Sequence, residues 1–262
     1  MFWWYFFLFI LGLQLGSFIN AFNYRLHIGQ SVWRGRSYCP HCHHLLSGWD
    51  LIPVVSFLML GGRCRYCRQP IGWHYPIVEI VAGVLLVLIW GFTADLFLAI
   101  FYSIVFLALL AIAEYDLKHY LISDKVLAFC LVISLSFLIN QSLAANNFFV
   151  WPDSIFLSGL MAALASGLFL GAIHLLTRGR GMGFGDVKLV FIIGLIVGWP
   201  SIILAVFLSF LIGAIIGLIL VASKKKRMKE VIPFGPFLVL GGLITALWGS
   251  QIINWYLSLI LW

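Results

Sequence analysis

Residues 181–188 have the sequence Gly-Met-Gly-Phe-Gly-Asp-Val-Lys, a polar, glycine-rich run that leads directly into an apolar segment. An ionisable side chain at the edge of a membrane-type segment is costly, so Asp186 is a candidate functional residue. Gly183 and Gly185, just before it, allow close backbone approach. A carboxylate at a helix start also complements the helix dipole, so this run alone leaves a structural and a functional interpretation open.

A second acidic cluster, residues 114–124, lies at another edge of an apolar segment. Two adjacent carboxylates can share a proton and activate water, which is the chemistry of aspartic proteases. Asp116 and Asp124 are on the order of 12 Å apart along a helix, too far to pair with each other. We predict the pair Asp116 and Asp186, with Asp116 at the junction after a helix. Asp124, which we expect to cap the next helix, remains the alternative partner of Asp186.

The composition predicts an all-α polytopic membrane protein. Apolar residues make up 63% of the 262 residues and charged residues 10%, with a mean hydropathy of +1.08. The first segment has no basic start and no cleavage site for a signal peptidase, so we expect a retained helix. About eight transmembrane helices are predicted, near residues 2–23, 76–90, 96–113, 122–140, 154–176, 186–199, 201–222 and 237–260. The sixth is too short to span a bilayer unless part of it is unwound.

The basic residues predict the topology. All sixteen Lys and Arg lie within residues 25–68, 118–125, 178–188 and 224–229. This alternation is what the positive-inside rule predicts for an even number of spans, with both termini outside and the basic loops cytoplasmic. The net charge of +7 is therefore explained by topology and by contact with the lipid bilayer, and we expect no nucleic-acid partner.

The only sizeable soluble stretch carries two C-x-x-C pairs, Cys39 with Cys42 and Cys64 with Cys67. Four thiolates at this spacing predict a tetrahedral structural zinc site. A cytoplasmic location disfavours disulfides, and the nearby histidines are interpreted as loop residues. A module this small cannot bury enough core alone, so its folding should be coupled to metal binding.

The ordered series of motifs resembles the type IV prepilin peptidase family, the bifunctional leader peptidases and N-methyltransferases with a G-x-G-D motif. The resemblance covers nearly the whole chain. It rests on the two C-x-x-C pairs and on residues 16–25, 50–53, 62–64, 75–79, 116–124, 183–188 and 232–236. Two departures are Ser123 and His27, where the family commonly has proline, and neither removes a functional group.

The resemblance implies a bacterial inner-membrane aspartic protease that removes the short basic leader of type IV prepilins or pseudopilins. It also implies methylation of the new N-terminus with S-adenosylmethionine. The catalytic pair of the family corresponds to Asp116 and Asp186, and Glu79 with residues 50–63 are candidates for the methyl transfer. Further supporting residues are Asp124, Gly183, Gly185 and Lys188. The implied domains are a first transmembrane helix (1–24), a cytoplasmic zinc domain linked to methyl transfer (25–75) and a seven-helix membrane peptidase (76–262).

Two other functions remain as alternatives. One is another G-x-G-D intramembrane aspartic protease, such as a preflagellin or presenilin-like enzyme. The other is a non-enzymatic transporter with Asp116, Asp186 and Glu79 as a proton relay, although the internal repeats of many transporters are not evident here. The sequence leaves open which prepilins are cut, whether they serve pili, secretion or competence, the residues that bind S-adenosylmethionine, and the oligomeric state. No Rossmann-type glycine fingerprint marks a site for the methyl donor.

Overall fold

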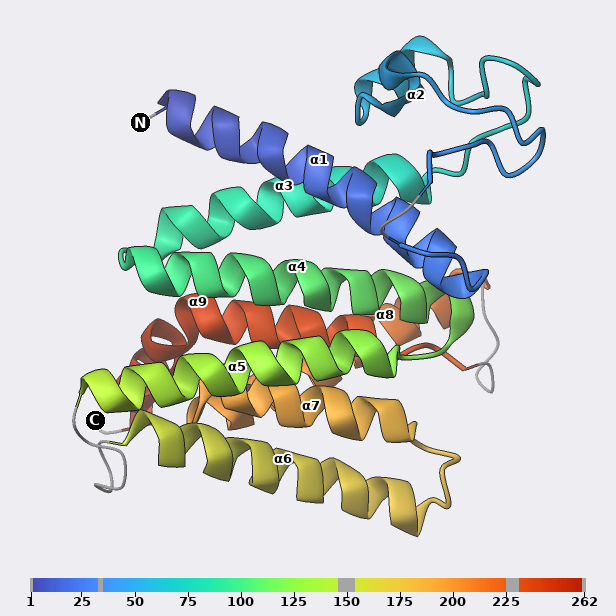
Figure 1. Ribbon diagram of the computed structural model, residues 1–262. Helices are drawn as coiled ribbons and strands as arrows, with labels where there is room; N and C mark the ends of the chain where they lie inside the picture. The colour runs from blue at the N-terminus through green and yellow to red at the C-terminus, as the bar shows by residue number, and fades with distance from the viewer. Residues whose placement is uncertain (1, 33–34, 146–153, 225–230, 261–262) are drawn as a thin grey trace. The chain divides into compact units, whose positions relative to one another are not determined.

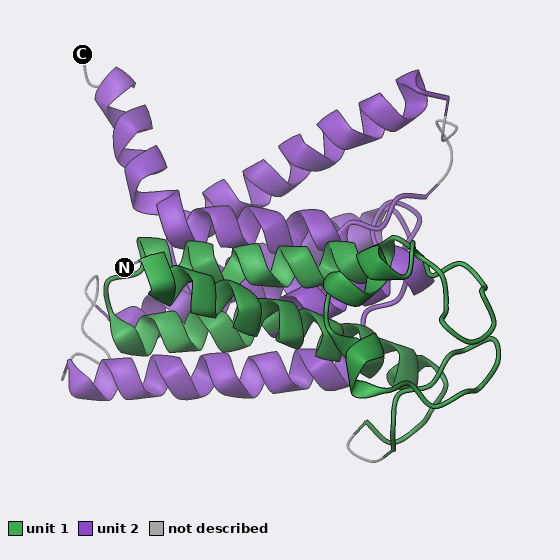
Figure 2. Cartoon of the chain, turned by 90° about the horizontal axis from the view of Figure 1, so that it is seen from above, with its two compact units in different colours: residues 1–107 green, residues 108–262 purple. Residues whose placement is uncertain are grey.

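The computed structural model describes residues 2–32, 35–145, 154–224 and 231–260 (Figure 1). These residues form helices and loops, with two isolated β-bridges and no extended strand among them. The chain divides into two compact units, residues 1–107 and 108–262, and the boundary falls inside one long helix (Figure 2).

Unit 1 is built on a pair of packed helices. Its elements are α1 (Phe2–His27), the short η1 (Gly48–Leu51) and α2 (Val55–Met59), α3 (His74–Phe92) and the first part of α4 (Leu96–His119). A Cβ added at Gly16 of α1 would lie 2.6 Å from the Cα of Glu79 in α3, so only glycine permits this approach. Near it, the Asn20 side chain donates a hydrogen bond to the Tyr75 carbonyl at 3.1 Å. These small and polar residues of α1 therefore allow its close packing against α3.

Unit 2 is organised around its shortest helix. Its elements are the rest of α4, α5 (Asp124–Ala144), α6 (Ile155–Leu176), α7 (Phe184–Val197), α8 (Ser201–Ala222) and α9 (Gly235–Ile260). The helix α7 contacts α5, α6, α8 and α9, and half of its apolar side chains are buried. One part of this core joins Leu138 of α5, Ala163 of α6 and Leu195 of α7. The glycine-rich run therefore begins the helix against which α5, α6, α8 and α9 pack.

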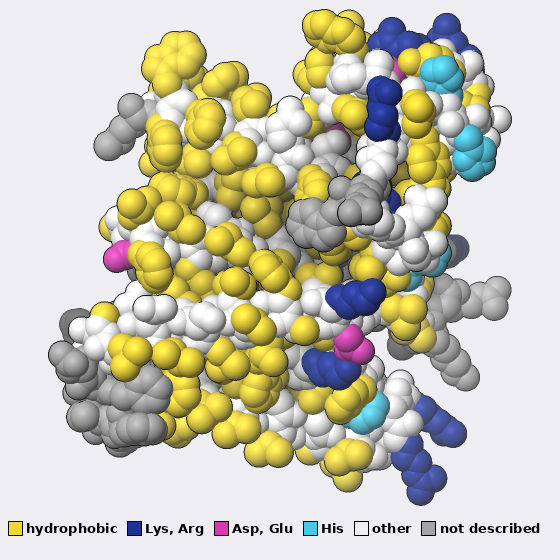
Figure 3. Space-filling view, viewed as in Figure 1, with side chains coloured by type: hydrophobic (Ala, Val, Ile, Leu, Met, Phe, Trp, Pro, Cys, Tyr) yellow, Lys and Arg dark blue, Asp and Glu magenta, His cyan; other side chains and the backbone are white. Residues whose placement is uncertain are grey.

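The helices are those of a multi-pass membrane protein. Among the described residues, seven helices are long and apolar enough to cross a bilayer. The remaining predicted segment, the sixth, is α7, whose 14 residues are too few for a full span, as the sequence predicted. Hydrophobic side chains cover the sides of the helices, while Lys and Arg gather near helix ends and in the segment between α1 and α3 (Figure 3).

Two local predictions were wrong. The helix before the acidic cluster continues to His119, so Asp116 lies inside α4 and not at a junction after it. The ion pair between Glu114 and Lys118, one helical turn apart, favours this extension. At the next helix, Ser123 is the N-cap, and Asp124 is the first helical residue and makes no capping hydrogen bond. Asp124 therefore lacks the structural role that was expected of it.

Candidate active site and metal centre

Asp116 is a buried carboxylate near the end of α4, 5% exposed. Its Oδ2 accepts a hydrogen bond of 3.1 Å from the backbone N–H of Gly235, the first residue of α9. Backbone N–H groups at a helix start have no partner within the helix, so a carboxylate there satisfies one of them. The fold thus brings two segments that are 119 residues apart to the same point.

Asp186 is also buried, 8% exposed, and belongs to the first turn of α7. Its Oδ2 accepts a 3.2 Å hydrogen bond from the backbone N–H of Gly183, the N-cap residue of that helix. Gly185 packs closely against Ile122. A Cβ added at this position would lie 3.1 Å from the Ile122 side chain. Both glycines of the motif therefore occupy places where the backbone passes close to other atoms.

The structure places Asp116 near enough to Asp186 for the two carboxylates to interact electrostatically. Each accepts one hydrogen bond from a backbone N–H. Within the described residues, neither carboxylate forms an ion pair with a basic side chain. Such an arrangement leaves carboxylate oxygens available to a water molecule and a substrate.

Asp124 and Lys188 lie outside this buried pair. They form an ion pair with each other at 2.7 Å, and their side chains are 75% and 41% exposed, respectively. The Lys188 ammonium also lies 5.2 Å from the centre of the Phe184 ring. The pair joins the first turns of α5 and α7 at the surface, and an exposed ion pair of this kind contributes little to stability.

The four predicted zinc ligands converge in unit 1. The Sγ atoms of Cys39, Cys42, Cys64 and Cys67 all lie within 4.8 Å of one another, and those of Cys39 and Cys67 are 3.9 Å apart. A tetrahedral zinc with Zn–S bonds of about 2.3 Å requires sulfur atoms separated by about 3.8 Å. The donor set and its geometry fit a structural zinc ion, and no histidine belongs to this cluster of described residues.

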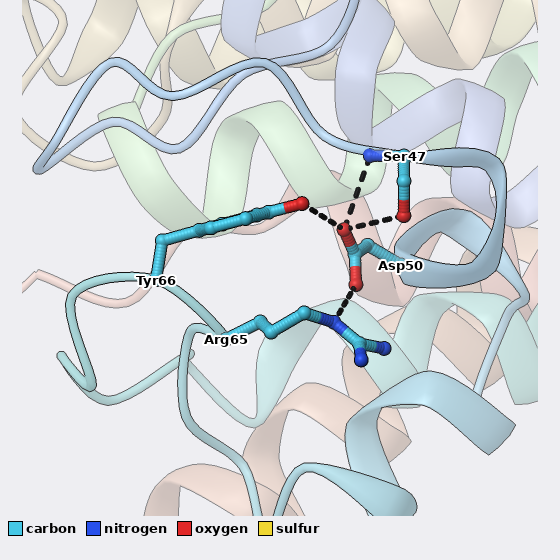
Figure 4. Close-up of polar contacts among 4 residues, drawn as sticks. All are labelled: Ser47, Asp50, Arg65 and Tyr66. Carbon is cyan, nitrogen blue, oxygen red and sulfur yellow. Dashed lines mark hydrogen bonds and ion pairs between the residues drawn. The ribbon is translucent and has the colours of Figure 1, made fainter.

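Asp50 braces the segment between the two cysteine pairs (Figure 4). It accepts hydrogen bonds from the backbone N–H and the hydroxyl of Ser47, from Arg65 Nε and from the Tyr66 hydroxyl, at 2.7 to 3.3 Å. Burial opposes ionisation, but the donors from Ser47 and the Arg65 guanidinium outweigh it and lower the pKa of the Asp50 carboxyl. This carboxylate is fully occupied by its neighbours.

Glu79 lies in α3, within unit 1, and is 7% exposed. Its Oε2 accepts a 2.8 Å hydrogen bond from the backbone N–H of Val54, the residue that precedes α2. Val54 has φ of 59°, a left-handed conformation that is unfavourable for a β-branched residue. Glu79 therefore connects the pair of helices α1 and α3 to the segment that carries the four clustered cysteines.

Comparison with known families identifies the two parts of the chain separately. Residues 10–92 match the bacterial peptidase A24 N-terminal domain, and residues 103–218 match the type IV leader peptidase family. The chain belongs to the type IV leader peptidase family. It is therefore an enzyme, and the predicted family resemblance is confirmed.

Curated relatives of this leader peptidase match it over nearly their full length. A prepilin leader peptidase/N-methyltransferase of Legionella pneumophila is 36% identical, covering 95% of this chain and 93% of the relative. The protein of that name from Bacillus subtilis is 35% identical over 97% of this chain and 98% of the relative. The one from Pseudomonas aeruginosa is 33% identical over 95% and 92%. No solved structure matches the chain.

Gly235 lies at the candidate site, but the sequence alone assigned no role to it. A Cβ at Gly235 would lie 2.6 Å from Asp116 Oδ2, so a larger residue would displace the carboxylate. The run Ile-Pro-Phe-Gly-Pro at residues 232–236 contributed to the family resemblance, but nothing in it showed which residue it would contact. The motif was therefore visible in the sequence, but its contact with Asp116 was not.

Proposed function

We propose that this protein removes the leader from type IV prepilins or pseudopilins with a catalytic pair formed by Asp116 and Asp186, and then methylates the new N-terminus. The observation that carries the peptidase half is the pair itself. The two buried carboxylates interact with each other, and each is held by one backbone N–H at a helix start. Membership in the leader peptidase family supports the choice of substrate.

The proposed mechanism needs no covalent intermediate. Two carboxylates that interact electrostatically can share one proton, since ionising both places like charges together. The ionised carboxylate takes a proton from water as general base, and the protonated one donates a hydrogen bond to the scissile carbonyl. The Gly183 and Gly235 N–H groups hold the two side chains in place, and each leaves oxygen lone pairs for these contacts.

Asp124 is the weaker candidate for the first aspartate. Its side chain is 75% exposed and its carboxylate is already paired with Lys188. A carboxylate that is exposed and paired with a lysine is a poor general base. It does not share a proton with Asp186, and bulk water surrounds it. This contrast favours Asp116 as the partner of Asp186.

We place the enzyme in the bacterial inner membrane, with both termini outside and the basic loops and zinc segment cytoplasmic. The distribution of Lys and Arg supports this orientation. The ends of α4 and the starts of α5 and α7 then meet the cytoplasmic boundary, where the cationic leader of a membrane-inserted prepilin would lie. When bound to the four cysteines, zinc would supply a structural crosslink, because no ligand position is left open for a substrate.

The test is cleavage of a synthetic prepilin by the purified protein in liposomes, with products weighed with and without S-adenosylmethionine. We expect Asp116→Asn and Asp186→Asn each to lower the cleavage rate by roughly 10²- to 10⁴-fold, the range attributed to a general acid or base. Asp124→Asn is the matched control and should cleave at nearly the wild-type rate. Cleavage by Asp116→Asn but not by Asp124→Asn would show that the first aspartate is wrongly assigned.

A folded, zinc-loaded wild type that leaves the leader intact would overturn the proposal. A proton-flux measurement in the same liposomes would then test the transporter alternative. A product that gains a methyl mass only with S-adenosylmethionine would establish the second activity.

A further inference from the structure

Unit 1 contains a pocket that the peptidase mechanism does not use. It has a volume of about 370 Å³ and lies between the end of α1, the start of α3 and the zinc-containing segment. Small-molecule sites occupy about 300 to 1,000 Å³ and combine apolar walls with a few polar groups. The size of this pocket therefore fits a ligand of nucleoside or amino-acid dimensions.

One wall of the pocket carries hydrogen-bond acceptors that lack a cationic partner. Asn20 is 3% exposed, and its Oδ1 has no hydrogen-bond partner among the described residues, although its amide group donates to Tyr75. Glu79 also lines the pocket and forms no ion pair with a described basic side chain. Only the Asn20 Oδ1 is an unpaired buried acceptor, because the Glu79 carboxylate accepts the Val54 N–H. Burying a charge without a counter-charge is costly, and a bound ammonium or sulfonium group would offset the charge of Glu79.

Another wall carries a prepared hydrogen-bond donor. Asp50 holds Arg65 through Nε alone, and Figure 4 shows the two terminal nitrogens of Arg65 pointing away from Asp50. Within the described residues, these two nitrogens make no hydrogen bond that would occupy them. A guanidinium oriented in this way suits a carboxylate, which it can bind through two parallel hydrogen bonds.

Aromatic rings complete the lining. Tyr24 and Tyr38 lie edge to face with their centroids 6.1 Å apart, and both border the pocket. Such rings offer a surface on which a purine base can stack. The lining thus combines acceptors for a cation, a donor for a carboxylate and an aromatic surface for a base.

The backbone just before α2, which contacts the pocket residue Glu79, is held in an unfavourable conformation. Val54 adopts a positive φ, and its N–H donates to Glu79. Residues held in sparsely populated backbone regions concentrate at ligand sites, where the surrounding structure maintains them. The strain at Val54 is an independent indication that the position of this loop against α3 has a function.

We propose that this pocket binds S-adenosylmethionine, with Asn20 and Glu79 facing its cationic groups, Arg65 its carboxylate and the tyrosines its adenine. The inference rests on the methyltransferase half of the proposed function and names the residues that would hold the donor. A donor of this kind carries a sulfonium, an ammonium, a carboxylate and a purine, and the lining has a counterpart for each class of group.

The experiment is calorimetric titration of the zinc-loaded, full-length protein in detergent with S-adenosylmethionine and with its decarboxylated analogue. Arg65→Met should weaken binding of S-adenosylmethionine by about tenfold or more, as expected for a lost charge-assisted hydrogen bond. It should leave the affinity for the decarboxylated analogue unchanged. Arg68→Met removes the same charge from an exposed position outside the pocket lining and is the matched control.

The second variant is Glu79→Gln, which keeps an oxygen to accept the Val54 N–H and removes the negative charge. We expect it to weaken both ligands by about tenfold, since both are cationic. Asp95→Asn, in the α3–α4 connection, is its control within the same unit. Ultraviolet crosslinking of the labelled donor should modify peptides that contain pocket residues.

Several outcomes would overturn the inference. Equal weakening of both ligands by Arg65→Met would mean that the arginine only braces the segment. Wild-type affinity in Glu79→Gln, or crosslinking outside the pocket, would place the donor elsewhere. Lost methylation with unchanged donor affinity would assign the pocket to the amine of the cleaved substrate. If wild type cleaves the prepilin but does not bind the donor, this inference fails while the peptidase proposal stands.

Discussion

Asp50 in unit 1 and the pair of Asp116 and Asp186 in unit 2 all have buried carboxylates, but they differ in how many donors surround them. Asp50 accepts four hydrogen bonds, one of them from an arginine. Asp116 and Asp186 each accept one, from a glycine backbone N–H. A carboxylate with every oxygen occupied can only brace its neighbours, whereas one with free lone pairs can bind water or exchange a proton. The number of donors, more than burial, therefore distinguishes the bracing carboxylate of Asp50 from the two that we propose to be catalytic.

Removing zinc should have the largest effect on structure, and it tests the segment of unit 1 that Asp50 braces. Chelation, or Cys64→Ser, should unfold the segment between α1 and α3, because structural zinc sites contribute roughly 10–16 kcal/mol of apparent binding free energy. The measurement is limited proteolysis, with new cuts expected within residues 35–73. Cys130→Ser is the control, since Cys130 is buried in α5 and lies outside the metal cluster. A segment equally protected with and without metal would contradict the prediction.

Gly235→Ala tests the backbone position that holds the carboxylate of Asp116 in unit 2. The added methyl group would lie 2.6 Å from Asp116 Oδ2, so the carboxylate must move. A displacement of about 1 Å at a reacting group can cost roughly 100-fold in rate, and we expect a loss of that size in leader cleavage. The control is Gly217→Ala in α8, where the nearest atom to an added Cβ is 3.7 Å away. Equal rates for both variants would show that Gly235 does not position Asp116.

Asp50→Asn should destabilise the segment that carries the four cysteines by about 2 kcal/mol. The side-chain NH₂ of asparagine cannot accept a hydrogen bond, so it would face a donor that one carboxylate oxygen of Asp50 satisfies. Since the pKa of Asp50 is lowered in the folded state, its contribution is fully present above the unfolded pKa of about 3.9. That contribution is lost as the pH falls through the lowered folded value. Resistance to proteolysis should therefore differ between variant and wild type near neutral pH and converge in strong acid. Tyr66→Phe, which removes one weaker donor, should have a smaller effect.

Asp124→Asn should have the smallest effect on stability. It tests whether an exposed carboxylate in an ion pair contributes less than the buried carboxylates of Asp50, Asp116 and Asp186. An exposed ion pair contributes less than about 1 kcal/mol, so thermal stability should be nearly unchanged. Lys188→Met, which breaks the same pair from the other side, should behave alike in the same melting experiment. A large loss of stability in only one of the two variants would mean that the surviving side chain has another partner.

The sequence predicted the helical membrane architecture well, because long apolar segments and alternating basic loops are constraints of the bilayer itself. It also predicted that the four cysteines would form a metal-binding cluster, because two C-x-x-C pairs have the spacing of a tetrahedral site. It misjudged where the third segment ends, since Glu114 and Lys118 extend a helix that hydropathy alone would stop at Ala113. It also misjudged Asp124, whose partner Lys188 is 64 residues away.

By itself, the sequence determined what is local and periodic: the spans, the cysteine pairs, and the two acidic runs at segment edges. The tertiary structure decided what depends on distant partners. It brought Asp116 to the Gly235 N–H and within electrostatic range of Asp186, and it gave Asp50 its four donors. It also left the Oδ1 of Asn20, a residue that lines the pocket, without a hydrogen-bond partner among the described residues. These differences arise because a side chain's chemistry is set by the atoms that surround it, and residues far apart in the chain supply those atoms.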